Sequence, residues 1–316
     1  MTDEISGRGP FVTGPLSVWR YVDCGTAIPA GITLPNLPEL GDDDETPPPL
    51  VERDGTAVTM HFHDVARFQI DFADHTITGF DIDPETDDCV IVHILHDHIA
   101  PRLLAELGEL VLHASTVQFG DRVALFLGES GAGKSTLATS LHQAGHRLLG
   151  DDAVIVTRGL EGYLAQPVYP SLRLYPEAIE SLLGSDTATS PMANYSDKQH
   201  VHLPALADVA GKPVALAALF FLAGPGDAAE PTAKPLASTW TCIKLVEQSF
   251  TLDARDRRCA ARRLDALSQL ALAVPAYQLC YPHDFARIGD VHAVIEAIID
   301  NPGPDAPAQH LGSLAQ

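Results

Sequence analysis

The sequence predicts an α/β fold in which a mostly parallel or mixed sheet surrounds a phosphate-binding loop. Residues 128–136 read Gly-Glu-Ser-Gly-Ala-Gly-Lys-Ser-Thr, a complete G-x-x-x-x-G-K-[ST] motif. The apolar run at 123–127 is typical of a buried strand, and Leu137 and Leu141 have the spacing of one helical face. Strand, loop and helix therefore follow one another in the order that this motif requires.

Residues 1–100 are predicted to form a small β-rich N-terminal domain. Short, partly alternating runs separated by turns indicate strands at 17–22, 57–63, 67–71 and 76–82. Between the first two runs, residues 41–49 are acidic and proline-rich, which is typical of a loop. A helical pattern over 98–107 then leads to a strand candidate at 110–117.

Residues 101–300 are predicted to form a second domain around the phosphate-binding loop, followed by a flexible tail at 301–316. The helix after the loop is expected over 136–144. We interpret 147–149 and 153–157 as one strand interrupted by Gly150-Asp151-Asp152, and 184–195 as a mobile loop near the site. Further extended segments are indicated at 163–168, 171–174 and 214–222, and further helices at 176–183, 239–245, 256–272 and 285–299.

Composition narrows the classes of partner. The chain has 316 residues, of which 46% are hydrophobic, so it is long and apolar enough for a sizeable core. Its 42 acidic and 20 basic residues give a net charge of -22, which argues against nucleic acid and against an anionic membrane surface. The acidity would attract a basic peptide, but it also simply aids solubility.

The sequence also bears on location. We find no basic and apolar leader at the start and no apolar stretch of membrane-spanning length, so we expect neither secretion nor insertion. The five cysteines are scattered without a C-x-x-C pair, as in reduced, packed thiols of a cytoplasmic protein: Cys24, Cys89, Cys242, Cys259 and Cys280.

The phosphate-binding loop itself predicts a nucleotide site. Its glycines allow successive backbone N–H groups to surround phosphates, Lys134 reaches the outer phosphates, and the Ser135 hydroxyl is placed to ligate Mg²⁺. The expected nucleotide-binding residues are Gly128, Glu129, Ser130, Gly131, Ala132, Gly133, Lys134, Ser135 and Thr136.

Two adjacent carboxylates, Asp151 and Asp152, follow the helix after the loop. They lie between the apolar segments Leu148-Leu149 and 153–156, so they emerge from a buried element rather than from an exposed turn. Beside Mg²⁺-ATP, one carboxylate can hold the metal while the other accepts a proton from an attacking hydroxyl. We therefore take Ser135, Asp151 and Asp152 as the candidate metal ligands.

Three further residues are candidates on weaker grounds. His113 lies in an apolar strand just before the strand of the loop, where it is either a core histidine or an orienting group for the Asp pair. Lys198 follows the Ser/Asn-rich segment and is either an exposed lysine or a group that offsets charge on a transferring phosphoryl group. Arg173, with apolar neighbours, fits a buried ion pair and a substrate clamp equally.

Three groups of histidines are weaker candidates, in this case for a metal site. His93-x-x-His96-x-His98, His61-x-His63 and His200-x-His202 are not accompanied by a familiar set of cysteine or carboxylate ligands. We therefore do not expect a structural metal at these positions.

Taken together, the candidate residues resemble the HPr kinase/phosphorylase family of protein serine kinases. The family pattern is a strand histidine, the loop G-x-S-G-x-G-K-S, a helix, and then G-H-R-L-x-x-D-D. This chain has His113, the loop 128–135, and Gly-His-Arg-Leu-Leu-Gly-Asp-Asp at 145–152, without a gap. The resemblance implies a core similar to phosphoenolpyruvate carboxykinase. It also implies that Asp152 is the base that accepts the serine hydroxyl proton and that His113 is the histidine beside it. Lys134 matches the lysine of the family's phosphate-binding loop, and Ser135 matches its Mg²⁺ ligand.

The chain departs from that family downstream. The expected glycine-rich signature with a Mg²⁺-binding glutamate is replaced by Tyr-Pro-Ser-Leu-Arg-Leu-Tyr-Pro-Glu at 169–177, in which Glu177 is the nearest candidate. The whole of 15–298 is more similar to a divergent HPr kinase-like group from gene clusters for ribosomally made, modified peptides. Its shared features include Leu-Pro-Glu-Leu at 37–40, Leu-His-Ala-Ser at 112–115 and a later lysine, here Lys198.

This resemblance implies an ATP- and Mg²⁺-dependent serine kinase that acts on a peptide or protein. Some members of the group phosphorylate the C-terminal serine of a lasso-peptide precursor, which makes such a precursor the leading acceptor. Relatives form homo-oligomers, so that state is open for this chain. The alternatives are a nucleotide-binding regulatory module without transferase activity, and a kinase of HPr or of a small-molecule hydroxyl.

Overall fold

The computed structural model describes residues 16–29, 32, 49–193, 196–203, 206, 212–224, 228–282 and 284–301. The chain divides into two compact units, Met1–Ala100 and Pro101–Gln316. Apart from Pro49 and Asn301, the predicted acidic loop at 41–49 and the predicted tail at 301–316 lie outside the described residues, as does the Leu-Pro-Glu-Leu segment at 37–40.

The first unit contains a five-stranded sheet in the order β1-β5-β4-β3-β2. Its strands are β1 (Arg20–Asp23), β2 (Leu50–Asp54), β3 (Ala57–Phe62), β4 (Ala66–Asp71) and β5 (Thr76–Phe80). β1 pairs with β5 in parallel, and the other pairs are antiparallel. Four of the strands confirm sequence predictions. β2 was missed because most of its residues are exposed and it shows no apolar alternation.

A helical stretch follows that begins ten residues before the predicted start at 98. It consists of α2 (Asp88–His93), the π-helical turn η2 (Ile94–Ile99) and α3 (Ala100–Leu107). A π-turn adds a residue to the turn and shifts the apolar stripe, so the segment does not keep a single 3.6-residue period. The earlier part of the helix was therefore not recognised.

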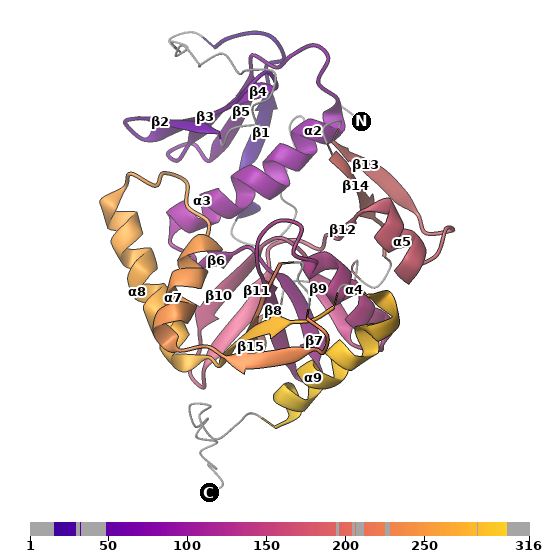
Figure 1. Ribbon diagram of the computed structural model, residues 1–316. Coiled ribbons are helices and arrows are strands. Elements are labelled where there is room, and N and C mark those ends of the chain that lie inside the picture. Colours follow the sequence, from indigo (N-terminus) through magenta and orange to yellow (C-terminus); the bar gives the residue numbers. More distant parts are fainter. Residues whose placement is uncertain are drawn as a thin grey trace, which may run out of the picture. The chain divides into compact units, whose positions relative to one another are not determined.

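The second unit is built on a mixed nine-stranded sheet (Figure 1). Seven strands run in the order β6-β10-β11-β15-β8-β7-β9, β17 pairs with β15, and β16 pairs with β17. β15 is parallel to β8 and β17, whereas the other pairs are antiparallel. The strands are β6 (Val111–Leu112), β7 (Ser115–Phe119), β8 (Arg122–Leu127), β9 (Arg147–Gly150), β10 (Val154–Arg158), β11 (Tyr163–Pro167), β15 (Val214–Leu222), β16 (Thr232–Pro235) and β17 (Ala276–Cys280).

Helices cover both faces of this sheet, and each face has its own core. On one face lie α4 (Lys134–Gln143), α5 (Pro176–Leu182) and α9 (Ile288–Asp300), the last preceded by the short turn η3 (Phe285–Arg287). On the other face lie α7 (Ser238–Glu247) and α8 (Arg257–Ala273) (Figure 1). The second unit is therefore a three-layer α/β/α structure.

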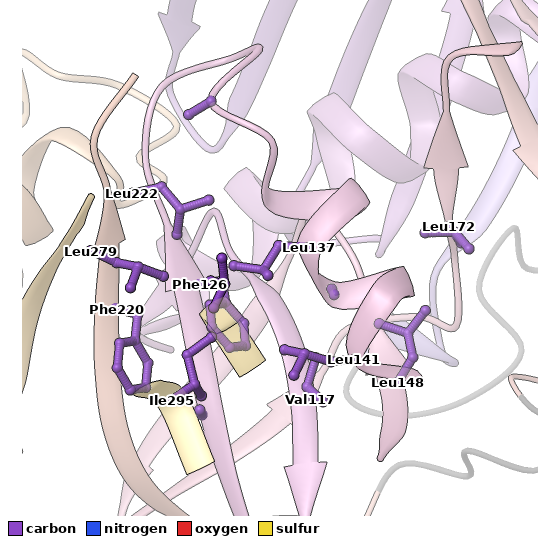
Figure 2. Packing of buried hydrophobic residues seen from close by; sticks show 14 of the residues in the cluster. Val117, Phe126, Leu137, Leu141, Leu148, Leu172, Phe220, Leu222, Leu279 and Ile295 are labelled. Carbon is purple, nitrogen blue, oxygen red and sulfur yellow. The ribbon is translucent and has the colours of Figure 1, made fainter. Parts of the chain in front are cut away.

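The period of two in β8 divides its side chains between these cores. Phe126 belongs to one buried cluster with Leu137 and Leu141 of α4 and Ile295 of α9 (Figure 2). Leu125 belongs instead to the cluster that includes residues of α7 and α8. Because residues 123–127 of β8 are apolar and buried, the loop that follows starts from the buried end of the strand.

A separate three-stranded sheet in the order β12-β14-β13 corrects part of the prediction of a mobile loop at 184–195, because residues 189–193 form one of its strands. Its strands are β12 (Arg173–Leu174), β13 (Thr189–Ala193) and β14 (Ser196–Val201). The segment is polar in composition, but β13 and β14 form an antiparallel pair, and Met192 and Val201 are buried. Residues 189–193 are held by backbone pairing, which residue composition does not reveal.

Two predicted strands are divided in the structure. Residues 147–149 and 153–157 belong to different parts of the sheet, because β9 pairs with β7 whereas β10 pairs with β6 and β11. Asp152, with a φ of 77°, turns the chain between them. The strand predicted over 110–117 is likewise interrupted between β6 and β7, at His113 and Ala114.

None of the helices among the described residues combines the length and the apolar character needed to cross a membrane.

Candidate functional site

The phosphate-binding loop connects the end of β8 to the first residue of α4. Gly128, Gly131 and Gly133 have φ values of 152°, 80° and 90°, which residues other than glycine rarely adopt. A Cβ atom on Gly128 would lie 3.2 Å from the carbonyl oxygen of Leu222, and one on Gly133 would lie 3.2 Å from the hydroxyl oxygen of Tyr281. Backbone conformation therefore favours glycine at all three positions, and lack of space adds to the requirement at Gly128 and Gly133.

Lys134 is buried and faces its own loop. Its Nζ donates to the carbonyl oxygens of Gly128, at 2.8 Å, and of Glu129, at 3.0 Å. Burial lowers the pKa of Lys134, while the negative charges of Asp151 and Asp152 work in the opposite direction. A buried cation surrounded by neutral carbonyl groups would be better compensated by an anion, and a phosphate group supplies that charge.

Strand register explains why residues distant in sequence meet at this loop. β7 runs antiparallel to β8 on one side and to β9 on the other. Ser115 therefore pairs with Phe126 near the end of β8, and Thr116 pairs with Gly150 at the end of β9. The start of β7 consequently lies at the same sheet edge as the loop after β8 and the acidic pair after β9.

Asp151 is the most buried acid of this edge, with 1% of its surface exposed. The Ser115 hydroxyl donates to its Oδ1 at 2.5 Å, and the Ser171 hydroxyl donates to its backbone carbonyl at 3.1 Å. Burial, together with the charge of Asp152, raises the pKa of Asp151 to about 6, although Ser115, Ser135 and Arg173 oppose the shift. Its Oδ2 has no hydrogen bond of ordinary geometry from any residue that the structure describes.

Asp152 is held by Arg173 rather than by His113. The guanidinium donates from Nε to Oδ2 at 2.8 Å and pairs through Nη2 with Oδ1 at 2.5 Å. His113 Nε2 lies 3.7 Å from Oδ1, beyond hydrogen-bond distance. Of the two readings left open for Arg173, the structure shows the buried ion pair. An orienting role for His113 stays a prediction.

His113 lies against the ring of Phe250, with ring centroids 6.0 Å apart and planes inclined by 2°. Its backbone N–H donates to the carbonyl oxygen of Gln248 at 2.7 Å. The side chain is 39% exposed, but its surroundings are dense and cationic. Burial lowers the pKa of His113 to about 4, Lys134 adds to the shift, and Asp152 opposes it.

Lys198, which follows the Ser/Asn-rich segment in the sequence, lies in β14. Its Nζ lies 5.3 Å from the centroid of the Tyr175 ring. Its positive charge contributes to the lowered pKa values of Lys134 and His113, so it acts electrostatically on both. Glu177, the other downstream candidate, is exposed in the first turn of α5.

The residues present fit a divalent cation. The observation that carries this is the Asp151 Oδ2 atom, a buried carboxylate oxygen without a hydrogen-bond partner among the described residues. The Ser135 hydroxyl acts on the same carboxylate. Carboxylate and hydroxyl oxygens are the ligand types that Mg²⁺ prefers, so Asp151 and Ser135 are the residues that would hold it.

Two residues of this site were missed from sequence. Ser115 contacts Asp151 directly, and Ser171 holds the backbone of the same residue. A serine that interrupts an apolar strand was a usable signal for Ser115. Ser171 had no such signal, because it lies in an irregular segment and acts on backbone.

Outside this site, one group of three residues within the described part of the chain has the proximity to hold a metal: Glu106, Asp256 and Cys259. Asp256 already caps α8, since its side chain accepts from the backbone N–H groups of Arg258 and Cys259. His61 pairs with Glu52 at 3.0 Å, and His93 pairs with Asp97.

No protein-family model matches the chain. No curated protein matches it either. Among solved structures, the chain is similar to the HPr(Ser) kinase/phosphatase from Coxiella burnetii, with 14% sequence identity and a TM-score of 0.31. The similarity covers 61% of this chain and 99% of the other.

Proposed function

We propose that the protein is an ATP- and Mg²⁺-dependent serine kinase that transfers the γ-phosphoryl group to a hydroxyl of a peptide or protein. The observation that carries the proposal is the placement of two buried carboxylates, Asp151 and Asp152, at the sheet edge where the loop 128–136 begins. The sequence pattern from His113 to Asp152, which resembles that of HPr kinase/phosphorylases, supports the same assignment.

In this proposal the loop and Lys134 bind the β- and γ-phosphates of ATP. The serine oxygen of the acceptor forms a bond to the γ-phosphorus, the bond from that phosphorus to the β–γ bridging oxygen breaks, and ADP leaves. The Asp152 carboxylate accepts the hydroxyl proton. Asp151 and Ser135 would hold a magnesium ion, which would neutralise part of the charge of the phosphates. Lys134 and Lys198 offset the charge that develops on the transferring group.

For the acceptor, we propose the C-terminal serine of a lasso-peptide precursor. This part rests on the sequence resemblance to HPr kinase-like proteins of modified-peptide gene clusters, carried by Leu-His-Ala-Ser at 112–115, the Asp151–Asp152 pair and Lys198. The net charge of -22 adds a preference for a peptide that is not itself strongly acidic.

The experiment is incubation of the full chain with Mg²⁺-ATP and a short peptide ending in serine, followed by mass spectrometry. We expect one phosphate to be added to the peptide at its terminal serine. A peptide ending in alanine, otherwise identical, is the matched control and should gain none. The Lys134→Met variant, which lacks the cation of the loop, should bind ATP weakly and transfer nothing.

Two outcomes would contradict the proposal in different ways. Phosphorylation of a small hydroxyl compound but of no peptide would assign a small-molecule kinase. Tight ATP binding with no transfer to any peptide, protein or small hydroxyl compound would assign a regulatory module that binds nucleotide.

A further inference from the structure

Arg173 is buried, with 9% of its surface exposed, and each nitrogen of its guanidinium group has a partner. Nε and Nη2 pair with the two carboxylate oxygens of Asp152, at 2.8 and 2.5 Å. Nη1 lies 3.4 Å from the sulfur atom of Met192 in β13. All three nitrogens of the guanidinium are therefore engaged, and the group is fixed in plane.

The residue that Arg173 holds has a strained backbone. Asp152 has a φ of 77°, and such a conformation costs a residue other than glycine about 1–3 kcal/mol. Such strain persists only where the surroundings determine the conformation. Two interactions supply those restraints: the ion pair that Arg173 forms with the Asp152 carboxylate, and the hydrogen bond that the Ser171 hydroxyl donates to the carbonyl oxygen of Asp151. Both come from the short segment 171–173.

The other side of Arg173 belongs to the three-stranded sheet. Its backbone pairs with His200 of β14, and Leu174 pairs with Gln199, the neighbour of Lys198. Arg173 is thus a covalent part of the sheet that carries Lys198 and a direct partner of Asp152. Any shift of β12 would move the Asp152 carboxylate.

We propose that Arg173 is a positioning residue, through which the sheet β12-β14-β13 orients the Asp152 carboxylate toward the acceptor hydroxyl. The inference rests on the proposed kinase function. A carboxylate offers about four acceptor sites, so two-point pairing with Arg173 leaves one lone pair on each oxygen for a hydroxyl. Orientation is what phosphoryl transfer demands most from the protein, since the reaction depends on positioning and electrostatics.

The test compares Arg173→Met and Arg173→Lys with the wild type in the peptide assay. Lysine keeps the charge but lacks the planar fork, so it cannot hold both oxygens in one plane. We expect kcat to fall roughly 10²-fold in Arg173→Met and roughly tenfold in Arg173→Lys, with the dissociation constant for Mg²⁺-ATP within about threefold of wild type. A purely structural role would lower the yield of folded protein without this separation of kcat from nucleotide affinity.

A matched control is Arg67→Met in the first unit. Arg67 also forms an ion pair, with Asp81 at 2.7 Å, but contributes none of the contacts described for Asp151 or Asp152, so its loss should leave kcat unchanged. If Arg173→Met does not fold, the kcat of Arg173→Lys relative to wild type tests the positioning role. Unchanged kcat in the folded Arg173 variants, with an active wild type, would overturn the positioning role alone. A wild type that phosphorylates no peptide would overturn the proposed function, and the positioning role with it.

Discussion

The Ser115 hydroxyl donates to the Oδ1 atom of Asp151 across 2.5 Å and links the first residue of β7 to the residue that follows β9. One oxygen of a fully buried carboxylate is thereby satisfied, and the other has no hydrogen-bond partner among the described residues. An unmatched buried oxygen of this kind is costly for the fold, and it therefore indicates where a ligand would be received.

The burial of the Asp151 carboxylate leads to a first prediction, which concerns the pH dependence of folding stability. The pKa of Asp151 is raised from 3.8 to about 6 by burial, so the folded protein binds more protons than the unfolded chain between these pH values. Stability therefore falls as pH rises from about 4 to 6. Asp151→Asn keeps the shape but cannot ionise, so it should gain on the order of 2–3 kcal/mol relative to wild type between pH 4 and pH 7.

The measurement is urea unfolding of both proteins across that pH range. The isosteric variant Asp265→Asn in α8, which lies far from the loop in sequence, is the control for general charge effects. A difference between Asp151→Asn and wild type that does not change with pH would show that Asp151 is already ionised in the fold.

A second prediction concerns the metal. Asp151→Asn should weaken ATP binding in the presence of Mg²⁺ by roughly tenfold or more, because it removes a charged ligand. Binding of ATP in the presence of a chelator should change little. Isothermal titration with and without Mg²⁺ measures both. Equal losses in the two conditions would assign Asp151 to the nucleotide and not to the metal.

The cationic surroundings of His113 lead to a third prediction. Its pKa, lowered to about 4, means that the imidazole is neutral at pH 7 and that stability from this group is lost as pH falls from 6.5 toward 4. Lys198→Met removes one of the charges that disfavour protonation, so the titration midpoint of His113 should rise. NMR of the imidazole protons gives this midpoint. Lys234→Met in β16 removes the same charge elsewhere and is the control.

The loop glycines provide a fourth prediction. Gly133→Ala combines a φ of 90° with a close approach to the Tyr281 hydroxyl, whereas Gly131→Ala has a φ of 80° and open space. We expect Gly131→Ala to lose about 1 kcal/mol of stability and Gly133→Ala roughly 2–3 kcal/mol. Chemical unfolding measures both. Gly289→Ala, in α9 with open space around it, should be neutral or stabilising. Equal losses at 131 and 133 would show that Tyr281 does not crowd the loop.

The sequence predicted the elements next to the loop closely, because β8 and α4 combine an uninterrupted apolar pattern with the defined spacing of the loop motif. It predicted the structure less well where backbone pairing or backbone conformation determines the arrangement of the chain. The turn at Asp152, the order of β9 and β10 in the sheet, and the hairpin β13–β14 leave no apolar period in the sequence.

For the site, adjacency in sequence pointed to Asp151 and Asp152 and to the loop, because these residues stand at the ends of buried strands. The partners of the acidic pair could not be read in the same way. Ser115 reaches Asp151 through antiparallel register, and Arg173, the first residue of β12, reaches Asp152 across a separation of 21 residues. Such long-range relationships follow from tertiary structure and from no local pattern.

We propose above all that Asp152 accepts the proton of the acceptor hydroxyl in a phosphoryl transfer from ATP. The most direct measurement compares Asp152→Asn with wild type for transfer to a serine-terminated peptide, with ATP affinity measured on the same samples. We expect transfer to fall by roughly 10²–10⁴-fold while the dissociation constant for Mg²⁺-ATP stays close to that of wild type. Transfer at the wild-type rate by a variant that binds ATP normally would contradict it.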